Sequence, residues 1–320
     1  MKSNLKPRKQ PLDAEYQLME FNWEDFSELD LLTSNLNPSP VSPNSNQLKF
    51  FQLNQRRSEI VDQLTKNYVI SHNLNYPNKP MICLLQEPFY YKQGNFYSPD
   101  TSYAPPIYLH NPGTRARAAI CCPKIYNPKP VHQLMSRDSA AAVITINKES
   151  ILIVSVYNPP NTDPTSLLSF LEGNLNSLHL SKAVIGGDLN CRSILWSNED
   201  SPFGEIFEGF TLSNDLQCIN PSNHEPTFCG PMGNSCIDAT FISSSLTDRV
   251  NSWQLHPLNI FEGLDHRPIS FQLSLDDTPT PNPPGFDFRK IDKSINVSNK
   301  NQDTTPISAC QMEPNEPSRH

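Results

Sequence analysis

The sequence predicts an α/β domain over residues 48–275, built from two packed β-sheets with helices on the outside. Short runs of β-branched and apolar residues alternate with segments of helical spacing, a pattern typical of α/β proteins. Several of these runs are apolar on both faces, so the strands they form should be covered on both sides. Strands outnumber crossover helices, and this favours two sheets packed together with helices outside them.

Eight segments of this domain are predicted as strands. In chain order they read "LKFFQLN", "MICLLQ", "ARAAICC", "AAAVITI", "ILIVSVY", "KAVIGGD", "CIDATFI" and "RPISFQL". A helix is predicted after the first strand, because Ile60, Val61, Leu64, Tyr68 and Val69 recur at helical spacing. Two further helices are expected over residues 164–178 and 204–215.

The two ends of the chain are predicted to lie outside the folded domain. The chain has 31 Pro against 11 Gly, and its hydrophobic fraction of 37% is below that of an average compact domain. Residues 1–47 combine acidic residues with the linker-like stretch "NPSPVSPNSN", and residues 276–320 form a proline-rich polar tail. We expect both ends to be disordered, although residues 13–35 could form a short amphipathic helix on a protein partner.

The net charge of −8 argues against a nucleic-acid partner, but the charges are segregated along the chain. Residues 13–30 contain seven acidic side chains and no Lys or Arg, whereas residues 88–137 contain six bases and one acid. This basic block is large enough to follow a phosphate backbone. The alternative is an ordinary solvated loop surface.

The eight cysteines are scattered without a C-x-x-C pair, so we expect reduced core thiols. The first residues, "MKSNLKPRKQ", are charged with no following apolar segment, and no apolar run approaches the ~20 residues of a membrane span. We therefore expect an intracellular protein, located in the nucleus and without a membrane partner. The "KPRK" tetrapeptide is either a nuclear signal or an ordinary charged terminus.

Polar residues suited to phosphate chemistry stand at or near the predicted strand ends. They are Asn54, Glu87, Tyr157, Asp188, Asn190, Asp238 in the middle of a strand, and Asp265 and His266 before the last strand. Strand ends of an α/β fold deliver side chains into a shared crevice. Each residue alone has an ordinary explanation, such as a turn, a helix cap or core packing. Their occurrence in this order favours a single site.

This set of residues fits metal-assisted hydrolysis of a phosphate ester. Carboxylate and amide oxygens are ligands that suit Mg²⁺ or Mn²⁺. Such an ion would polarise the phosphoryl oxygen and stabilise the leaving oxyanion. Asp188 and Asn190 could orient a water and hold a phosphate oxygen, and a histidine paired with an aspartate supplies an imidazole of fixed tautomer.

Five motifs, "LLQEP", "VYNPPN", "GGDLNCRSILW", "SCIDATF" and "LDHRPISF", occur in this order. Together they resemble the endonuclease/exonuclease/phosphatase superfamily over nearly all of residues 48–275, and in particular the apurinic-type endonuclease domain of non-LTR retrotransposons. The Pro-Pro pair after Tyr157 and the later Trp196 point to that branch. The resemblance implies a DNase I-like, four-layer α/β sandwich of two mixed β-sheets flanked by helices.

The resemblance also implies which residues hold the metal and which hold the substrate. Glu87 and Asn54 would bind Mg²⁺ or Mn²⁺, Glu87 most directly, and Asp265 would lie beside the ion. Tyr157 and Asn190 would contact the scissile phosphate.

Three further residues are implied to be catalytic. Asp188 would align and activate the attacking water. His266 would face the phosphate as a base or as a donor that stabilises charge, and Asp238 would orient it. The sequence departs from the family pattern at Leu264, which stands where a serine usually precedes the Asp-His pair.

Basic residues in the loops are expected to contact DNA. Arg115, Arg117 and Arg137 belong to the basic block, and Arg192 follows the Asp-Asn pair. Contacts from such residues to phosphates would position a duplex without reading its sequence. The alternative for Arg117 is a strand position with a local salt bridge.

The sequence thus predicts an Mg²⁺-dependent endonuclease that nicks one DNA strand and leaves a 3′ hydroxyl, as target-primed retrotransposition requires. Two alternatives stay open: a related phosphoesterase for abasic DNA or a phosphoinositide, and a catalytically dead relic that binds nucleic acid. No polymerase motif is present, and "FDFRKID" resembles the region leading into a reverse transcriptase. We therefore expect a truncated or domesticated fragment of such an element.

Overall fold

A computed structural model describes residues 46–275, apart from residues 92–93, 112, 179–180 and 261–262. These residues belong to the first of the two compact units of the chain, Met1–Thr280 and Pro281–His320. The predictions for both ends of the chain, including the partner helix over residues 13–35, lie outside the described residues.

The first sheet has five strands in the spatial order β12-β13-β1-β2-β3. They are Gln47–Asn54 (β1), Met81–Gln86 (β2), Ala118–Cys121 (β3), Val250–Leu255 (β12) and Ile269–Ser274 (β13). Strands β1 and β2 run parallel, with Asn54 opposite Gln86, and the other neighbours are antiparallel. The sheet is therefore mixed, and the parallel pair ends at one edge.

The second sheet has six strands in the order β4-β5-β6-β7-β11-β8. They are Lys129–Pro130 (β4), Ser139–Ile146 (β5), Glu149–Tyr157 (β6), Ala183–Asp188 (β7), Leu216–Cys218 (β8) and Asp238–Ser243 (β11). Strands β6 and β7 are its parallel pair, with Tyr157 opposite Asp188. Asp238 pairs with Asp188 at the start of β11. The prediction of a mid-strand Asp238 was therefore wrong, because Cys236 and Ile237 belong to the connection that precedes β11.

Three helices cover the outer faces of the sheets: α2 (Glu59–Asn75), α3 (Thr165–Leu175) and α4 (Pro202–Ser213). Helix α2 begins at Ser58, whose hydroxyl accepts a hydrogen bond from the Val61 amide (3.3 Å). The Ser201 hydroxyl caps α4 in the same way, and Pro202 occupies the first turn. No helix within the described ranges is long and apolar enough to cross a membrane.

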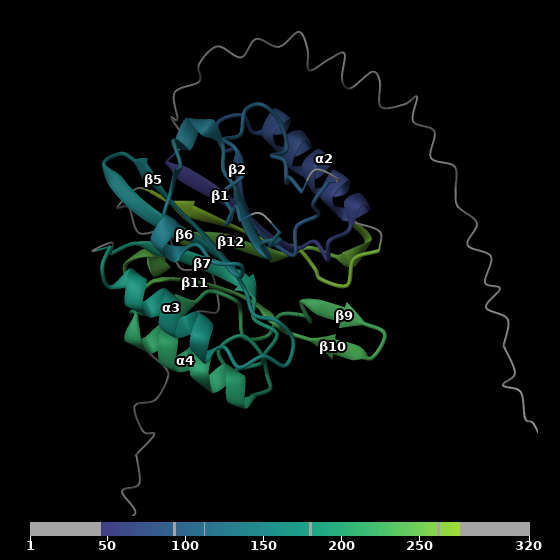
Figure 1. The fold of residues 1–320 in the computed structure, drawn as a ribbon, viewed down its shortest axis with the longest axis vertical. Coiled ribbons are helices and arrows are strands. Elements are labelled where there is room, and N and C mark those ends of the chain that lie inside the picture. Colours follow the sequence, from purple (N-terminus) through teal and green to yellow (C-terminus); the bar gives the residue numbers. More distant parts are fainter. Residues whose placement is uncertain (1–45, 92–93, 112, 179–180, 261–262, 276–320) are drawn as a thin grey trace, which may run out of the picture. The chain divides into compact units, whose positions relative to one another are not determined.

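Shorter elements complete the described chain. Four are 3-10 turns: Lys124–Tyr126 (η2), His132–Leu134 (η3), Ser244–Arg249 (η4) and Leu258–Ile260 (η5). Strands β9 (Phe228–Gly230) and β10 (Gly233–Ser235) form a hairpin that projects beside the body of the domain (Figure 1).

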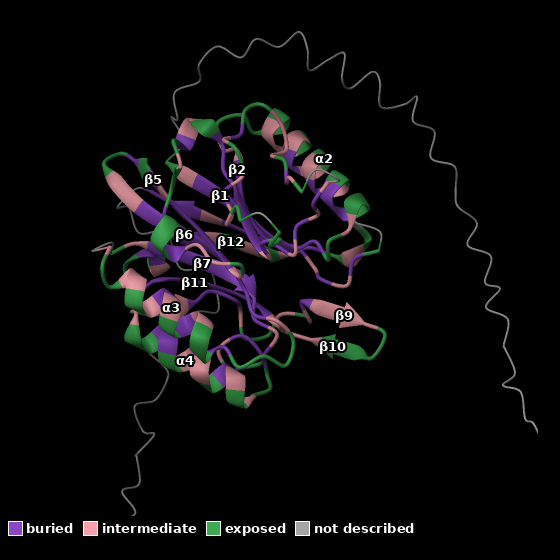
Figure 2. Cartoon of the chain, viewed as in Figure 1, coloured by how far each residue is buried: buried purple, intermediate pink, exposed green. Residues whose placement is uncertain are grey.

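The two sheets pack face to face, with α2 outside the first sheet and α3 and α4 outside the second (Figure 1). Phe50 of β1 and Phe271 of β13 stack in the central core with their ring centroids 4.7 Å apart. Trp196 is completely buried in the core beneath α3 and α4. The central strands of both sheets are accordingly buried almost throughout, whereas β4, β9, β10 and β12 are largely half-buried or exposed and each helix is exposed on one face (Figure 2). The predicted four-layer sandwich of two mixed sheets is confirmed.

A layer of polar side chains crosses the space between the sheets near the strand ends. The Gln52 amide donates to the Gly187 carbonyl (3.2 Å) and its oxygen accepts from the Thr240 hydroxyl (2.8 Å). A Cβ atom on Gly186 would lie 2.3 Å from that Gln52 oxygen. The glycine of the "GGD" motif therefore gives the glutamine the space it needs to join the two sheets.

Candidate active site

The ends of the two parallel strand pairs meet across the sandwich. Asn54 ends β1 and Asp188 ends β7, and the Asn54 amide donates to Asp188 Oδ2 at 2.8 Å. Both side chains are buried, with 2% and 1% of their surface exposed. The first sheet therefore contributes directly to the surroundings of a carboxylate that belongs to the second.

Asn190 holds the same carboxylate from the other side. Its backbone amide donates to Asp188 Oδ1 (3.1 Å) and its side-chain amide to Asp188 Oδ2 (3.0 Å). Asn190 has a φ of +48°, a left-handed conformation that asparagine tolerates better than most residues. The turn after β7 thus contributes two hydrogen bonds to the carboxylate of Asp188, and Asn54 contributes a third.

His266 lies between two buried carboxylates. Its Nδ1 is 3.0 Å from Asp238 Oδ2 and 3.1 Å from Asp238 Oδ1, whereas Nε2 is 3.8 Å from Asp188 Oδ2. The latter distance is longer than a hydrogen bond. Asp238 is fixed in turn, because Thr227 Oγ1 accepts from its backbone amide at 3.1 Å. This arrangement directs Nδ1–H at Asp238 and leaves Nε2 facing Asp188.

The pKa values of Asp188 and His266 are both raised, the first mainly by burial and the second by neighbouring charges. Burial raises the pKa of Asp188, and the charge of Asp238 raises it further. Burial alone would lower the pKa of His266, but the carboxylates of Asp238 and Asp188 outweigh it and raise the pKa to about 9. The folded protein therefore favours an imidazolium between the two aspartates.

Glu87 and Tyr157 lie at the same edge, close enough for Glu87 to influence the pKa of the Tyr157 phenol. Burial, together with the charges of Glu87 and Asp188, raises the pKa of the Tyr157 phenol, so that it remains a donor at neutral pH. Glu87 has a φ of +43° and also pairs with Arg57, whose Nη2 lies 2.7 Å from Glu87 Oε1. Neither partner was expected from the sequence.

Asp265 is held by a second arginine. Arg56 Nε lies 3.2 Å from Asp265 Oδ2, and the Asp265 carbonyl accepts from the Cys229 amide at the start of the hairpin (2.7 Å). Asp265 Oδ1 is buried and has no hydrogen-bond partner among the described residues. A buried carboxylate oxygen without a partner fits a site for a hard cation.

Two groups of residues could hold a metal. Within the described residues, one grouping of His, Cys, Asp and Glu has its ligand atoms within 4.8 Å of one another, and it consists of Asp188, Asp238 and His266. It is a candidate metal site. The second group is the predicted one, Glu87 and Asn54 with Asp265 beside them, which offers the oxygen atoms that Mg²⁺ prefers.

The arginines predicted to contact DNA differ in their surroundings. Arg117 forms a bidentate ion pair with Asp138, and its guanidinium lies 5.2 Å from the centre of the Tyr157 ring. The alternative of a local salt bridge therefore applies to Arg117. Arg192 pairs with Glu199 on the surface, whereas Arg115 and Arg137 are exposed.

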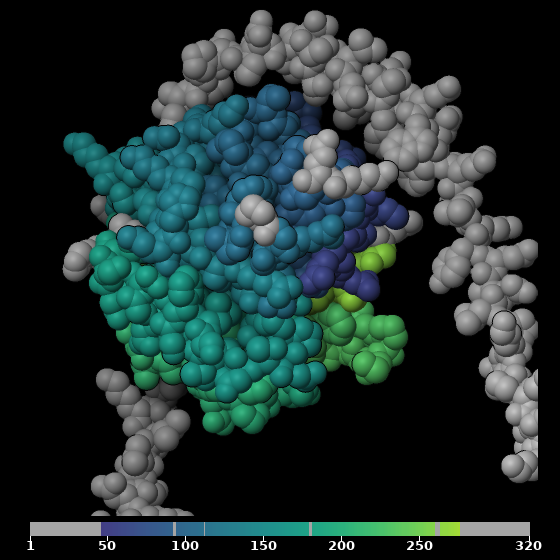
Figure 3. Space-filling model, in the orientation of Figure 1, coloured from purple at the N-terminus to yellow at the C-terminus, as the bar shows by residue number. Residues whose placement is uncertain are grey.

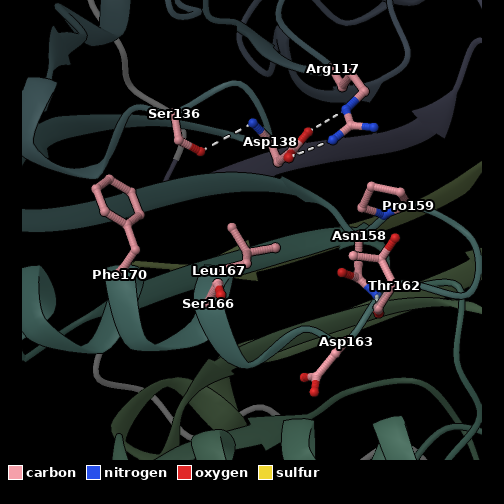
Figure 4. A pocket seen from close by; sticks show the side chains of 10 residues that line it. All are labelled: Arg117, Ser136, Asp138, Asn158, Pro159, Thr162, Asp163, Ser166, Leu167 and Phe170. Atoms are coloured by element: carbon pink, nitrogen blue, oxygen red, sulfur yellow. Dashed lines mark hydrogen bonds and ion pairs between the residues drawn. The ribbon is translucent and has the colours of Figure 1, made fainter.

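A pocket of about 250 Å³ opens beside the site (Figure 4). The Arg117–Asp138 ion pair stands on one side of it, and Phe170 of α3 stands on another. Asn158 also lines the pocket, and its carbonyl accepts from the Asn190 amide at 2.9 Å. One residue therefore connects the pocket to the turn that holds Asp188.

Several residues of the site were missed in the sequence. Arg56 and Arg57 follow Asn54 directly, but nothing in the sequence indicated that their partners come from other strands. Gln52 and Thr227 were also missed. For Gln52 there was a signal, because a glutamine near the end of the apolar run "LKFFQLN" requires a buried polar partner.

The fold is similar to solved structures of nucleases. The endonuclease domain of TRAS1, a telomere-specific non-LTR retrotransposon, is 20% identical, with a TM-score of 0.61 over 72% of this chain and 99% of that one. An AP endonuclease from Leishmania major is 13% identical, with a TM-score of 0.52 over 71% and 88%. One from Archaeoglobus fulgidus is 17% identical, with a TM-score of 0.52 over 70% and 98%. No curated protein matches the chain in sequence.

A sequence family described as "Endonuclease-reverse transcriptase" matches residues 151–270. This range begins just before Tyr157 and ends just after His266, so it contains the Asp188–His266–Asp238 cluster. The chain therefore matches a nuclease family over residues 151–270 and shares the fold of these endonuclease structures.

Proposed function

We propose that the protein is an Mg²⁺- or Mn²⁺-dependent endonuclease that hydrolyses a phosphodiester bond in one DNA strand and leaves a 3′ hydroxyl. The observation that carries this proposal is the buried His266 between Asp238 and Asp188, with Asn54 and Asn190 on the second carboxylate. Such an arrangement has a base, a charged donor and fixed amides within one cluster.

Asp188 is the proposed base that takes a proton from the attacking water. A base works best when its pKa lies near the working pH, and burial raises the pKa of Asp188 in that direction. Its three hydrogen bonds to Asn54 and Asn190 fix the carboxylate, so that little reorganisation is needed during attack.

His266 and Tyr157 are the proposed donors to the phosphate. With Nδ1–H directed at Asp238, the imidazolium offers Nε2–H to a non-bridging oxygen, where negative charge grows in the transition state. Tyr157 offers a phenol whose raised pKa keeps its proton in place. Asn190 contributes its side-chain amide beside them.

Glu87, Asn54 and Asp265 are the proposed metal ligands. The unpartnered Asp265 oxygen and the oxygen-rich donor set fit Mg²⁺ or Mn²⁺. When bound, such an ion stabilises the phosphoryl and leaving oxygens as a Lewis acid.

DNA is the proposed substrate, and the nucleus is therefore the proposed location. The matched family is described as an endonuclease, and the similar TRAS1 domain comes from a retrotransposon endonuclease. The exposed Arg115 and Arg137 lie in the basic block and are available for phosphates.

The test uses the full chain and a labelled DNA duplex with Mg²⁺ or with EDTA. We expect nicks that a DNA polymerase extends without prior phosphatase treatment, which identifies a 3′ hydroxyl. The same enzyme is given an abasic duplex and a phosphoinositide. Cleavage of the abasic duplex or of the phosphoinositide, while the undamaged duplex stays intact, would contradict the proposed DNA endonuclease.

A further inference from the structure

Arg56 and Arg57 occupy a strained turn between β1 and α2. Their φ values are +51° and +54°, a left-handed conformation that is uncommon for a single arginine and more so for two in succession. The Arg56 amide donates to Asn54 Oδ1 (2.8 Å), and the Arg57 amide donates to the Glu87 carbonyl (2.7 Å). The ends of β1 and β2 therefore hold both arginines in this conformation.

The turn directs the two guanidinium groups at two different carboxylates. Arg57 Nη2 lies 2.7 Å from Glu87 Oε1, and Arg56 Nε lies 3.2 Å from Asp265 Oδ2. Arg56 also donates to the Gly263 carbonyl (3.2 Å). These carboxylates are the two charged ligands of the proposed metal site, so each is neutralised by an arginine from the same turn.

The arginines cover the carboxylates from the solvent side. The arginine side chains are 48% and 54% exposed, whereas each carboxylate side chain is 19% exposed. In Figure 3, purple atoms from the part of the chain around the end of β1 and α2 lie near the green atoms of the β9–β10 hairpin. The two guanidinium groups are therefore exposed to solvent next to the carboxylates of the proposed metal site.

We propose that Arg56 and Arg57 exchange partners during the reaction cycle. They hold Asp265 and Glu87 while no metal is bound, and they turn to DNA phosphates when a divalent cation takes over these carboxylates. This inference rests on the proposed metal site and adds two phosphate-binding residues to it. Exposed ion pairs are weak and easily exchanged, and a guanidinium matches the geometry of a phosphate.

The exchange couples metal binding to DNA binding. The cation must displace two positive side chains, which weakens its binding in free protein, and the released arginines then strengthen binding of DNA. Coupling between two ligands is reciprocal, so DNA must also tighten binding of the metal. An arginine pair that merely stabilised the turn would give neither effect.

The test compares the full chain with an Arg56→Gln/Arg57→Gln variant, with Mn²⁺ as the probe. Mn²⁺ binding without DNA is followed by electron paramagnetic resonance. We expect the variant to bind Mn²⁺ about fivefold more tightly than the parent, because the ion no longer has to displace two exposed ion pairs. Binding of a DNA duplex is measured by fluorescence anisotropy against salt concentration, with Asp188→Asn present in every protein to prevent cleavage.

The salt dependence separates phosphate contacts from structural effects. In the parent, Mn²⁺ should steepen the logarithmic salt slope by about two relative to EDTA, one for each recruited arginine. The Gln variant should lose this difference, and an Arg56→Lys/Arg57→Lys variant should retain most of it. Arg249→Gln is the matched control, because Arg249 pairs with Glu149 at the opposite end of β6 and should change neither measurement.

Two failures can be distinguished. The exchange of partners would be overturned if the Gln variant bound Mn²⁺ as the parent does, or if it kept the parent's difference in salt slope between Mn²⁺ and EDTA. Either result would leave the endonuclease proposal intact. A parent chain that binds DNA in EDTA but binds no Mn²⁺ would overturn the metal site itself, and with it this inference.

Discussion

Asp238→Asn should uncouple His266 from its charge partner while preserving the shape of the site. In the folded protein, Asp238 Oδ2 lies 3.0 Å from His266 Nδ1, and its charge is the main influence that raises the pKa of His266 against the effect of burial. An asparagine has the same size but no charge. Burial then dominates, and the pKa of His266 should fall below its usual value.

The size of the effect follows from the pKa of His266. A value of about 9 against the ordinary 6.5 means that folding favours the imidazolium by about 3 kcal/mol. Because the pKa is raised in the folded protein, this contribution is fully present below about pH 6.5 and is lost as the pH rises through about 9. The variant should therefore be less stable than the parent by up to about 3 kcal/mol at low pH, with a smaller difference at high pH.

Urea unfolding at about pH 6 and about pH 10 measures this difference. Asp215→Asn is the control, because Asp215 is exposed and its left-handed φ of +52° suits asparagine. The imidazole ¹⁵N shifts of His266 give a second readout, and they should show a charged ring up to about pH 8 in the parent alone. A stability difference independent of pH, together with a parent His266 that titrates near its ordinary pKa, would refute the reasoning.

Glu87→Gln removes a charged ligand of the proposed metal site, so the Mg²⁺ concentration needed for half-maximal nicking should rise by about tenfold or more; a titration identical to the parent's would exclude ligation by Glu87. Gly186→Ala should lower the free energy of unfolding by about 1–3 kcal/mol, because its Cβ would lie 2.3 Å from Gln52 Oε1 and 2.8 Å from Leu84 Cδ1. Gly209→Ala is the matched control: a Cβ in this helix meets nothing within 4 Å and should stabilise the protein by about 0.5–1 kcal/mol. Equal effects of the two substitutions in urea unfolding would show that the space between the sheets is not tight.

The layers of the fold could be predicted because the long strands carry a strong pattern. Strands such as Glu149–Tyr157 are apolar on both faces, and this follows directly from their burial between two layers. Strands β8, β9 and β10 contain three residues each, too few for a periodic pattern to appear. These short strands were therefore missed.

The residue types of the site were predictable, but their partners were not. The order of the motifs identified Asp188, Asp238 and His266, whose side chains the structure brings together. The pair between Arg56 and Asp265 joins residues that are far apart in the sequence and depends on the antiparallel register of β1 and β13. Leu264 is 9% exposed in the cluster beneath α2, so an apolar side chain at this position belongs to the core.

The most direct test of the account is the rate at which the full chain nicks supercoiled plasmid in Mg²⁺, measured beside Asp188→Ala and the exposed control Glu205→Gln. We expect open circles that form in Mg²⁺ and are absent in EDTA, at the same rate for Glu205→Gln and at a rate at least about a hundredfold lower for Asp188→Ala. Equal nicking by the parent and Asp188→Ala, or an intact plasmid with a folded parent, would contradict the central claim that this edge of the sandwich hydrolyses DNA.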